Sequence, residues 1–599
     1  MMPVALHPSE SIAAEAAGAR LDTVAPMRPA PAPYDAILAG RPATVHETGN
    51  ELLSTRFLTK GLAFTREERE AFGLTGLLPD AVLTIDQQEE LEVEHLRRKS
   101  DDLERYIGLS ALQDRNATLF YRLMSDHLPE FLPIVYTPTV GRACQEFSHI
   151  LRRTRGTWIT PADAGRISEV LRSGPYEDVR LIVVTDNERI LGLGDQGAGG
   201  MGIPMGKLTL YSAAGIHPAL TLPVSLDVGT NNPKLLADPL YVGHRAPRLR
   251  GAEYDALVEE FVNAVVEVWP DCIIQWEDFK QQNALRILDR YRERVTSFND
   301  DVQGTSAVVV AGVIAAARAL EAPLLSQRIV LAGSGAAGIG IARLLRRLLL
   351  AEGASLADAQ RAIILVDSKG LVHAGRTDID EMKRALALPV EMATAYGLPT
   401  DGQLPGLHEI VRRVHPTVLV GTTGVGGTFS EAIIREMSLG SDRPVVFPLS
   451  NPTTQTEATP EDICRWTNER ALIATGSPFP AVPCRDGCHE IGQANNVFVF
   501  PGVGLGAMVT RARIISDDMF LVAARTLASH VTAERLECGA LFPSVADLRS
   551  ISHAIAVAVA REAIDSGLAR VPADTDVEEV VKAATWRPGY VPYVRPMEA

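Results

Sequence analysis

A single glycine-rich turn constrains the fold more than any other segment of this 599-residue chain. Residues 328–332 form an apolar run typical of a buried strand, and residues 339–350 have the apolar content of a helix. Between them the chain reads Gly-Ser-Gly-Ala-Ala-Gly. A strand, this turn and a helix in that order aim free helix N–H groups at a pyrophosphate. The residues expected to bind a dinucleotide here are Gly333, Gly335, Ala336, Ala337 and Gly338.

A second apolar run, residues 362–366, ends in Asp367, where an acid would bind a ribose diol. Asp367 lies farther from Gly333 than the usual ~20 residues, which indicates a longer first helix and a loop. Further strands are predicted at residues 418–420, 445–447 and 472–474, separated by helical stretches. This alternation predicts an α/β, doubly wound domain of the Rossmann type.

Two acidic stretches follow predicted elements in the middle of the chain. The apolar run 272–274 is read as a buried strand that delivers Glu277 and Asp278 at its end, and Asp300 and Asp301 precede a long helix former at 307–320. Such acids can be helix caps or solvated side chains. If they converge in a cleft, they repel one another unless a divalent cation neutralises them, and all-oxygen ligation suits Mg²⁺ or Mn²⁺.

Other segments place polar side chains at element ends. Residues 133–141 are read as a short strand that a proline turn stops at Tyr136. A second G-x-G-x-x-G, residues 192–197, is followed by more glycines and Pro204 where a helix should open. It is therefore read as a flexible loop with Arg189 at one end and Lys207 at the other. The adjacent amides of residues 495 and 496 are read as leading into a strand at 497–500.

Bulk properties exclude several classes of partner. The net charge of −16 disfavours nucleic acid and anionic membranes, and no apolar run reaches the ~20 residues of a membrane span. The six cysteines are too few and too scattered for a disulfide framework, so we expect free thiols and a cytoplasmic protein. Residues 1–45 are rich in Ala and Pro and are read as a disordered tail.

A nicotinamide-type fold beside a divalent-metal site suggests oxidation of a chelated 2-hydroxy acid followed by loss of CO₂. This chemistry needs a base for the hydroxyl proton and an acid to protonate the product carbon. A lysine in a partly desolvated segment and a tyrosine would supply them.

Six segments together resemble the signature set of the malic enzymes: residues 135–141, 185–207, 276–279, 298–305, 449–453 and 495–502. The resemblance runs from about Arg56 to Arg561. It implies the reaction L-malate + NAD(P)⁺ → pyruvate + CO₂ + NAD(P)H with Mn²⁺ or Mg²⁺. By position it implies metal ligands Glu277, Asp278 and Asp301, the base Lys207, the acid Tyr136 and a supporting Asp300. It also implies substrate contacts Arg189, Asn451 and Asn496, with Asn451 and Asn495 near the cofactor.

The resemblance also implies an organisation. We expect a substrate and metal domain with a helical N-terminal module over residues 46–300 and an NAD(P)-binding domain over 301–565. The part after about residue 496 is expected to pack back on the substrate domain, and 566–599 form a C-terminal extension. Homodimers or homotetramers are usual in the family.

Several alternatives stay open on sequence alone. Basic residues near Asp367 (Lys369, Lys383 and Arg384) suit an NADP 2′-phosphate, whereas the acid itself suits NAD. A malolactic type of enzyme, which makes lactate and retains NAD, shares most of the motifs, and a non-catalytic relative is a third possibility. Of the two arginines that bind a fumarate effector in animal relatives, one matches Arg69 and the other falls on Glu94, so no activation by fumarate is predicted.

Overall fold

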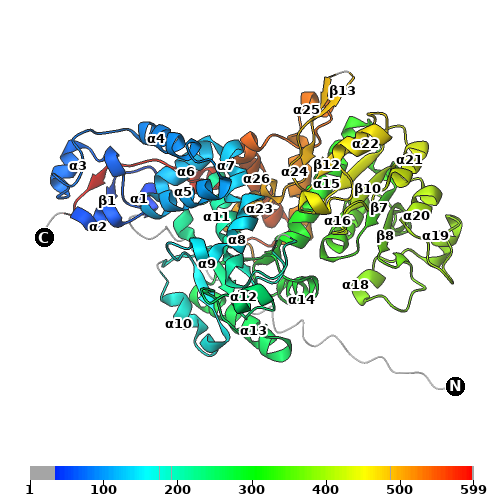
Figure 1. Ribbon diagram of the computed structural model, residues 1–599, viewed down its shortest axis with the longest axis horizontal. Coiled ribbons are helices and arrows are strands. Elements are labelled where there is room, and N and C mark those ends of the chain that lie inside the picture. The colour runs from blue at the N-terminus through cyan, green and yellow to red at the C-terminus, as the bar shows by residue number, and fades with distance from the viewer. Residues whose placement is uncertain (1–33, 175, 191, 486, 597–599) are drawn as a thin grey trace.

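The computed structural model describes residues 34–596, apart from residues 175, 191 and 486 (Figure 1). Helices of the N-terminal region lie at one end of the molecule, and a seven-stranded sheet lies at the other. A five-stranded sheet and the C-terminal helices lie between them. The fold is therefore α/β with two largely parallel sheets, as the sequence predicts.

The N-terminal region is helical, in agreement with its sequence pattern. Its main helices are α3 (Arg66–Ala71), α4 (Ile85–Arg97), α5 (Asp102–Arg115), α6 (Ala117–Asp126), α7 (Leu128–Val135) and α8 (Thr139–Gln145). The prediction of a tail to residue 45 is wrong for its last part. Helix α1 (Tyr34–Leu38) and strand β1 (Ala43–Thr44) lie there. Strand β1 is ordered because it pairs with β16 (Tyr593–Val594) and buries Ala43 completely. Residues 1–33 lie outside the described part of the chain.

The five-stranded sheet carries the acidic stretches at its carboxyl edge. Its strands run in the order β2 (Thr157–Ile159), β4 (Thr221–Leu226), β3 (Leu181–Thr185), β5 (Ile273–Trp276), β6 (Ser297–Asn299), and all are parallel. One face packs against α10 (Ile167–Arg172), α13 (Gly251–Val268) and α14 (Gln281–Tyr291). The other faces α11 (Gly202–Ala214) and α23 (Phe500–Thr510). Because β5 and β6 are parallel neighbours, the residues that follow them meet at one edge.

The seven-stranded sheet is the predicted doubly wound domain. Its order is β15 (Gly492–Gln493), β12 (Leu472–Thr475), β11 (Val445–Pro448), β10 (Val418–Gly421), β7 (Ile329–Ala332), β8 (Ile363–Asp367), β9 (Gly370–Leu371). Only the short β9 is antiparallel to its neighbour. Helix α16 (Ala336–Ala351) follows β7, and the strand order reverses beside β7, where such folds bind their ligands.

The last helices return to the first sheet. Helix α23 packs against α11 and α26 (Leu548–Asp565), and α24 (Asp517–Ser529) packs against α15 (Thr305–Ala319). The stretch Asp300–Ala319 has the length and mean hydropathy, 1.4, of a membrane span, but 78% of it is buried inside the protein. It is a core helix with two carboxylates at its start.

Two segments read as strands are helical. Residues 128–135 form α7, with Tyr136 directly after it, because buried Leu128, Phe131, Leu132 and Val135 repeat at helical spacing. Pro133 removes a single hydrogen bond from this short helix. Residues 496–498 form a 3₁₀ turn and α23 begins at Phe500, since Pro501 lies in the first turn, where its missing N–H is not needed.

The glycine-dense segment read as a flexible loop is packed tightly. A 3₁₀ turn, Gly197–Met201, leads into α11, so Lys207 lies inside a helix. Pro204 is the third residue of that helix, where no intrahelical partner is required. A Cβ at Gly202 would lie 2.8 Å from Sγ of Cys144, and one at Gly206 would lie 2.8 Å from the carbonyl oxygen of Val135. The glycines therefore serve close helix packing.

Candidate functional site

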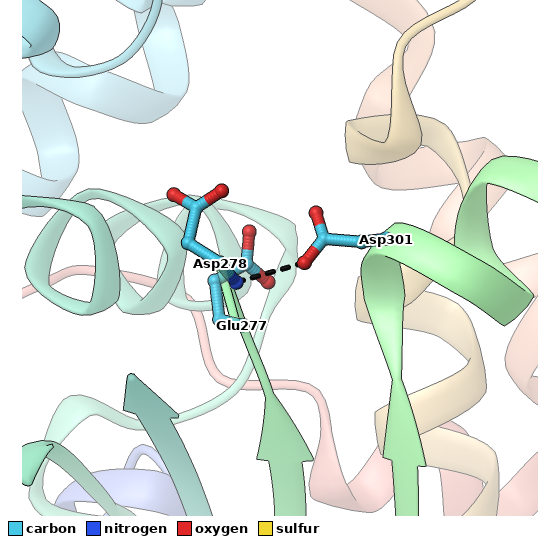
Figure 2. A group of neighbouring side chains, drawn as sticks. All are labelled: Glu277, Asp278 and Asp301. Atoms are coloured by element: carbon cyan, nitrogen blue, oxygen red, sulfur yellow. Dashed lines mark hydrogen bonds between the residues drawn. The ribbon is translucent and has the colours of Figure 1, made fainter. Parts of the chain in front are cut away.

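Three carboxylates from two neighbouring strand ends form one cluster. Glu277 and Asp278 follow β5, and Asp301 follows β6 (Figure 2). One oxygen from each of these side chains lies within 4.8 Å of the other two. Figure 2 shows Asp301 facing the two other acids across the gap between the strand ends. The structure thus brings together the three predicted ligands, in a geometry that suits a small divalent cation.

The backbone of Asp278 holds the cluster together. Its N–H donates to Oδ2 of Asp301 at 2.8 Å, and its carbonyl oxygen accepts from the backbone N–H of Arg189 at 3.1 Å. Asp278 adopts a positive φ of 56°, a conformation that Asp tolerates better than most residues. This turn joins the predicted substrate arginine, whose side chain is exposed, to the acidic cluster.

Lys207 is buried against this cluster. Its side chain is 2% exposed, and Nζ lies 3.1 Å from Oε1 of Glu277 and donates a hydrogen bond to Oδ2 of Asp300. Nζ also lies 4.5 Å from the ring centre of Phe500 and 5.5 Å from that of Tyr136. The predicted base therefore lies between the carboxylates and the ring of the predicted acid.

Burial dominates the ionisation of the cluster. It raises the pKa of Glu277 well above its usual range, although Lys207 pulls it down, and it raises the pKa of Asp301 to about 6. Burial would lower the pKa of Lys207, but Asp300 and Glu277 raise it well above its ordinary value. Burial also raises the pKa of Tyr136 far above 10, so its phenol stays protonated. A further positive charge would therefore stabilise the ionised forms of Glu277 and Asp301.

Asp300 lies directly behind the cluster. It is fully buried, and its Oδ2 accepts from Nδ2 of Asn496 at 3.0 Å as well as from Lys207. The same Nδ2 lies 3.0 Å from Oγ1 of Thr305. A Cβ at residue 304 would lie 1.9 Å from Oδ1 of Asp300, so only Gly304 leaves room for this carboxylate. Asn496, which was predicted to contact the substrate, and Lys207 thus donate to the same carboxylate oxygen of Asp300.

Two buried polar residues that the sequence analysis gave no role extend the network. Gln275 precedes Glu277 by two residues on β5 and donates from Nε2 to Oε2 of Glu277 at 2.9 Å. Tyr211 follows Lys207 by one helical turn on α11, and its hydroxyl donates to Oε1 of Gln275 at 2.5 Å. The sequence signals for these two residues were their spacings: Gln275 is two residues from Glu277, and Tyr211 is four residues from Lys207, so each pair lies on one face.

The glycine-rich turn has the form that its sequence predicts. Gly333 follows β7 with a positive φ of 109°, and its N–H donates to the carbonyl of Val366 at 2.9 Å. A Cβ at Gly338 would lie 2.0 Å from the carbonyl oxygen of Gly333, so the turn requires glycine there. Helix α16 begins at Ala336, and Ala337 and Gly338 form its first turn. The free backbone N–H groups of its first turn therefore lie next to Gly335.

Asp367 lies beside this turn, at the end of β8. Its Oδ1 accepts from the backbone N–H of Lys369 and from Nη1 of Arg376, both at 2.9 Å. Its Oδ2 lies 3.4 Å from Nζ of Lys383. Arg376 also makes a two-pronged ion pair with Asp378, at 2.9 and 3.0 Å, and Lys369 pairs with Asp378 at 2.8 Å. Lys369, Arg376 and Lys383 are therefore held by two acids, whereas Arg384 donates to the backbone carbonyls of Arg376 and Ile379.

Two predicted amides lie elsewhere. Asn451 follows β11 and accepts a hydrogen bond from the hydroxyl of Ser477. A Cβ at Gly192 would lie 2.8 Å from the carbonyl oxygen of Asn451, so the two sheets' loops meet here. Asn495 caps the turn at 496–498, its Oδ1 accepting from the N–H of Val497 at 3.0 Å. No contact among the described residues joins Asn451 directly to the carboxylate cluster.

The residue matching the effector arginine of animal relatives has a structural role. Arg69 is 7% exposed, and its guanidinium donates to the carbonyl oxygens of Phe64, Pro79 and Ala81 at 3.0, 2.7 and 2.8 Å. Glu94 is an exposed acid of α4 that pairs with Arg98. Neither of these two positions presents a free guanidinium group.

Comparisons with known proteins agree with this architecture. The model of the malic enzyme N-terminal domain matches residues 113–292, and that of the malic enzyme NAD-binding domain matches residues 302–564. The chain is 45% identical to the NAD-dependent malic enzyme of Vibrio campbellii, over 93% of this chain and 99% of that one. It is 46% identical to the NAD-dependent malic enzyme of Photorhabdus laumondii, over 93% and 98%.

A solved structure shows the same fold. The malic enzyme of Entamoeba histolytica superposes with a TM-score of 0.53 at 24% identity, over 84% of this chain and 91% of that one. The two family models together span most of the chain, and the relatives align along almost their whole length. The chain belongs to the malic enzyme family.

Proposed function

We propose that this chain catalyses the oxidative decarboxylation of malate, L-malate + NAD⁺ → pyruvate + CO₂ + NADH, with a divalent cation. The observation that carries the proposal is a buried lysine, Lys207, set between the cluster of Glu277, Asp278 and Asp301 and the neighbouring Asp300. A dinucleotide turn and a cation site in one chain suit a reaction that removes a hydride and then CO₂ from a chelated 2-hydroxy acid.

The donor set fits Mn²⁺ or Mg²⁺. Three carboxylates offer oxygen atoms within 4.8 Å of one another, and burial raises the pKa values of Glu277 and Asp301, so a cation between them would favour their charged forms. Oxygen ligands without His or Cys favour these hard cations over Zn²⁺. When bound, the cation supplies Lewis-acid polarisation of the substrate's hydroxyl and carboxylate oxygens.

The chain's own residues provide the proton transfers. Asp300 and Glu277 hold Nζ of Lys207 in place and keep it protonated in the cation-free protein. Neutralisation of these carboxylates when the cation site is loaded would free Nζ to accept the proton of the malate C2 hydroxyl as the hydride leaves C2. After CO₂ departs from C3, the hydroxyl of Tyr136 donates a proton to C3, and Lys207, 5.5 Å from that ring, returns a proton to Tyr136. Malate then yields pyruvate, CO₂ and NADH with no net proton released.

Arg189 and Asn496 position the substrate. Arg189 is exposed, its backbone N–H donates to Asp278, and its guanidinium lowers the pKa of Asp301, so it lies near the cluster and suits a malate carboxylate. The amide of Asn496 holds Asp300 against Lys207. Asn451 and Asn495 lie on loops at the carboxyl edge of the dinucleotide sheet, where the nicotinamide end of the cofactor would lie.

NAD⁺ is the preferred cofactor. The carboxylate of Asp367 ends the strand beside Gly333, where it suits a ribose diol and repels a 2′-phosphate. The neighbouring cations are engaged, because Arg376 is shared by Asp367 and Asp378 and Lys369 pairs with Asp378. The curated relatives from Vibrio campbellii and Photorhabdus laumondii are named NAD-dependent. We further place the protein in the cytoplasm as a homodimer or homotetramer, as is usual in the family.

A product assay tests the proposal. L-malate, Mn²⁺ and either NAD⁺ or NADP⁺ are mixed with the protein, and the reduced cofactor, pyruvate and lactate are followed together. The proposal predicts equal amounts of NADH and pyruvate. Lactate without net NADH would identify a malolactic type of enzyme, and no turnover of malate would identify a non-catalytic relative.

A further inference from the structure

A pair of buried residues outside the predicted site connects the metal cluster to the core. Gln275 and Tyr211 are both 0% exposed, and their hydrogen bond joins α11 to β5. The other residues of this face, such as Ile273 and Val183, are apolar and belong to the core. A polar pair in such a place costs free energy unless every polar atom is satisfied.

The pair and the cluster form two parallel contacts between one helix and one strand. Lys207 and Tyr211 are four residues apart on α11 and lie on one face of it. Gln275 lies on β5, and Glu277, two residues later, directly follows that strand. Lys207 meets Glu277 at 3.1 Å, and Tyr211 meets Gln275 at 2.5 Å. The second contact is then linked to the first by the 2.9 Å bond from Gln275 to Glu277.

The chemistry of the groups fixes the direction of every bond. The carboxylate of Glu277 can only accept, so Gln275 must present its NH₂ group to it and its carbonyl oxygen to Tyr211. The carbonyl oxygen then takes the phenol proton. Burial raises the pKa of Tyr211 well above its ordinary value, so the phenol remains a donor. The hydroxyl of Tyr211 therefore selects the amide orientation that serves Glu277.

The ring of Tyr211 is held in place by its packing against α23. Its ring packs against Phe500 with centres 4.8 Å apart, and a Cβ at Gly504 of α23 would lie 2.7 Å from the ring. Phe500 in turn lies under Nζ of Lys207 at 4.5 Å. The helix that returns from the far end of the chain thus fixes the tyrosine that orients the amide.

We propose that Gln275 and Tyr211 are positioning residues that orient the Glu277 carboxylate for the divalent cation. With Lys207 on Oε1 and Gln275 on Oε2, both oxygens of Glu277 are held by donors, and the carboxylate cannot rotate away from Asp278 and Asp301. Partners of this kind fix ligand geometry at metal sites. The inference rests on the proposed metal-dependent function.

Binding of Mn²⁺ to the full-length protein, followed by the electron paramagnetic resonance signal of free Mn²⁺, tests this role without any turnover. Gln275→Met keeps the length of the side chain and removes both polar groups. It is expected to weaken Mn²⁺ binding about 10- to 100-fold, as loss of such partners does elsewhere. Tyr211→Phe removes only the hydroxyl and is expected to weaken binding about three- to tenfold, the size of one hydrogen bond.

The chain offers a matched control. Tyr121 is 4% exposed on α6, and its hydroxyl accepts from the Gln113 amide at 2.9 Å, a tyrosine–glutamine pair with no carboxylate behind it. Tyr121→Phe should leave the Mn²⁺ dissociation constant unchanged. A second readout separates positioning from general damage: excess Mn²⁺ should restore the kcat of Tyr211→Phe to near the wild-type value, because only occupancy is impaired.

The outcomes are distinct. Dissociation constants for Gln275→Met and Tyr211→Phe within about twofold of wild type would overturn the positioning role while leaving the proposed function intact. A loss in Tyr121→Phe as large as that in Tyr211→Phe would also overturn it. Failure of the wild-type protein to bind Mn²⁺ would overturn the proposed function itself, and the inference with it.

Discussion

The backbone N–H of Asp278 donates to Oδ2 of Asp301 at 2.8 Å, so the turn after one strand holds the acid that follows the next strand. The carbonyl of the same residue accepts from the N–H of Arg189. One residue with a positive φ thus joins two metal-site acids and the predicted substrate arginine. This linkage holds Asp301 beside Asp278, while Lys207 and Gln275 hold Glu277.

The substitution Asp301→Asn tests the negative charge of Asp301 separately from its hydrogen bond to the backbone of Asp278. Asparagine keeps an oxygen that can accept from the Asp278 N–H, but it removes one of three clustered negative charges. Because losing a supporting partner already weakens metal sites about 10- to 100-fold, losing a ligand should weaken Mn²⁺ binding more than about 100-fold. The thermal unfolding temperature without metal should not fall. Unchanged Mn²⁺ binding would remove Asp301 from the ligand set.

Lys207→Met tests the proton acceptor. The substitution should lower kcat at least about 100-fold, the usual contribution of a general base, while NAD⁺ still binds. Lys280→Met is the matched control, because Lys280 is exposed and only faces Glu188 at 3.4 Å. The assay is NADH formation at saturating malate and Mn²⁺. If turnover of Lys207→Met stays within about tenfold of wild type, which is about 1.4 kcal/mol, the assignment is wrong.

Asp367→Ser tests cofactor selection. Removing the carboxylate abolishes its repulsion of a 2′-phosphate and leaves Lys383 and one side of Arg376 free to pair with that phosphate. The ratio of kcat/KM for NADP⁺ to that for NAD⁺ should rise at least about tenfold, equivalent to about 1.4 kcal/mol. Asp358→Ser, at the exposed start of α17 (Leu356–Ala362), should leave the ratio unchanged. An unaltered ratio in Asp367→Ser would mean that Asp367 does not face the ribose.

His217 should make stability depend on pH. It is 3% exposed among the rings of Tyr34, Phe57 and Trp586, and burial lowers its pKa from 6.5 to about 3. The folded state keeps His217 neutral while the unfolded chain protonates it below about pH 6.5. Stability from this group is therefore full above pH 6.5 and is lost on acidification, by about 1.4 kcal/mol per pH unit and about 2 kcal/mol by pH 5.

The test is urea unfolding between pH 7 and pH 5. In His217→Asn, the side-chain oxygen can still accept from the N–H of Ala219, as Nδ1 of His217 does at 3.1 Å. This variant should lose about 2 kcal/mol less than wild type over the acid range. His408→Asn, at an exposed position, should behave as wild type. Identical pH slopes for His217→Asn and wild type would refute the prediction.

The sequence predicted features that depend on local order along the chain. Acids after two strands and a glycine turn between a strand and a helix are local patterns, and Glu277, Asp301 and Gly333 lie where those patterns place them. Lys207 was placed at the end of a loop because glycines and Pro204 usually interrupt helices. In the folded chain these glycines allow helices to approach closely, which only the tertiary partners reveal.

The supporting residues could not be predicted for a related reason. Gln275 acts on Glu277 only because Tyr211, far away in sequence, meets it across a helix and a strand. Asn496 reaches Asp300 because the C-terminal helices return to the first sheet. The spacing along the chain indicates which residues share a face, but their partners on other elements appear only when the packing of α11, β5 and α23 is known.

The central claim is that the cluster of Glu277, Asp278 and Asp301 beside Lys207 decarboxylates malate only with a divalent cation. The most direct measurement follows NADH and pyruvate from L-malate and NAD⁺ with protein stripped of metal by EDTA, before and after Mn²⁺ is added. We predict no product before the addition and equal amounts of both products after it. Pyruvate and NADH formed at the same rate by the stripped and the Mn²⁺-loaded protein would contradict the account.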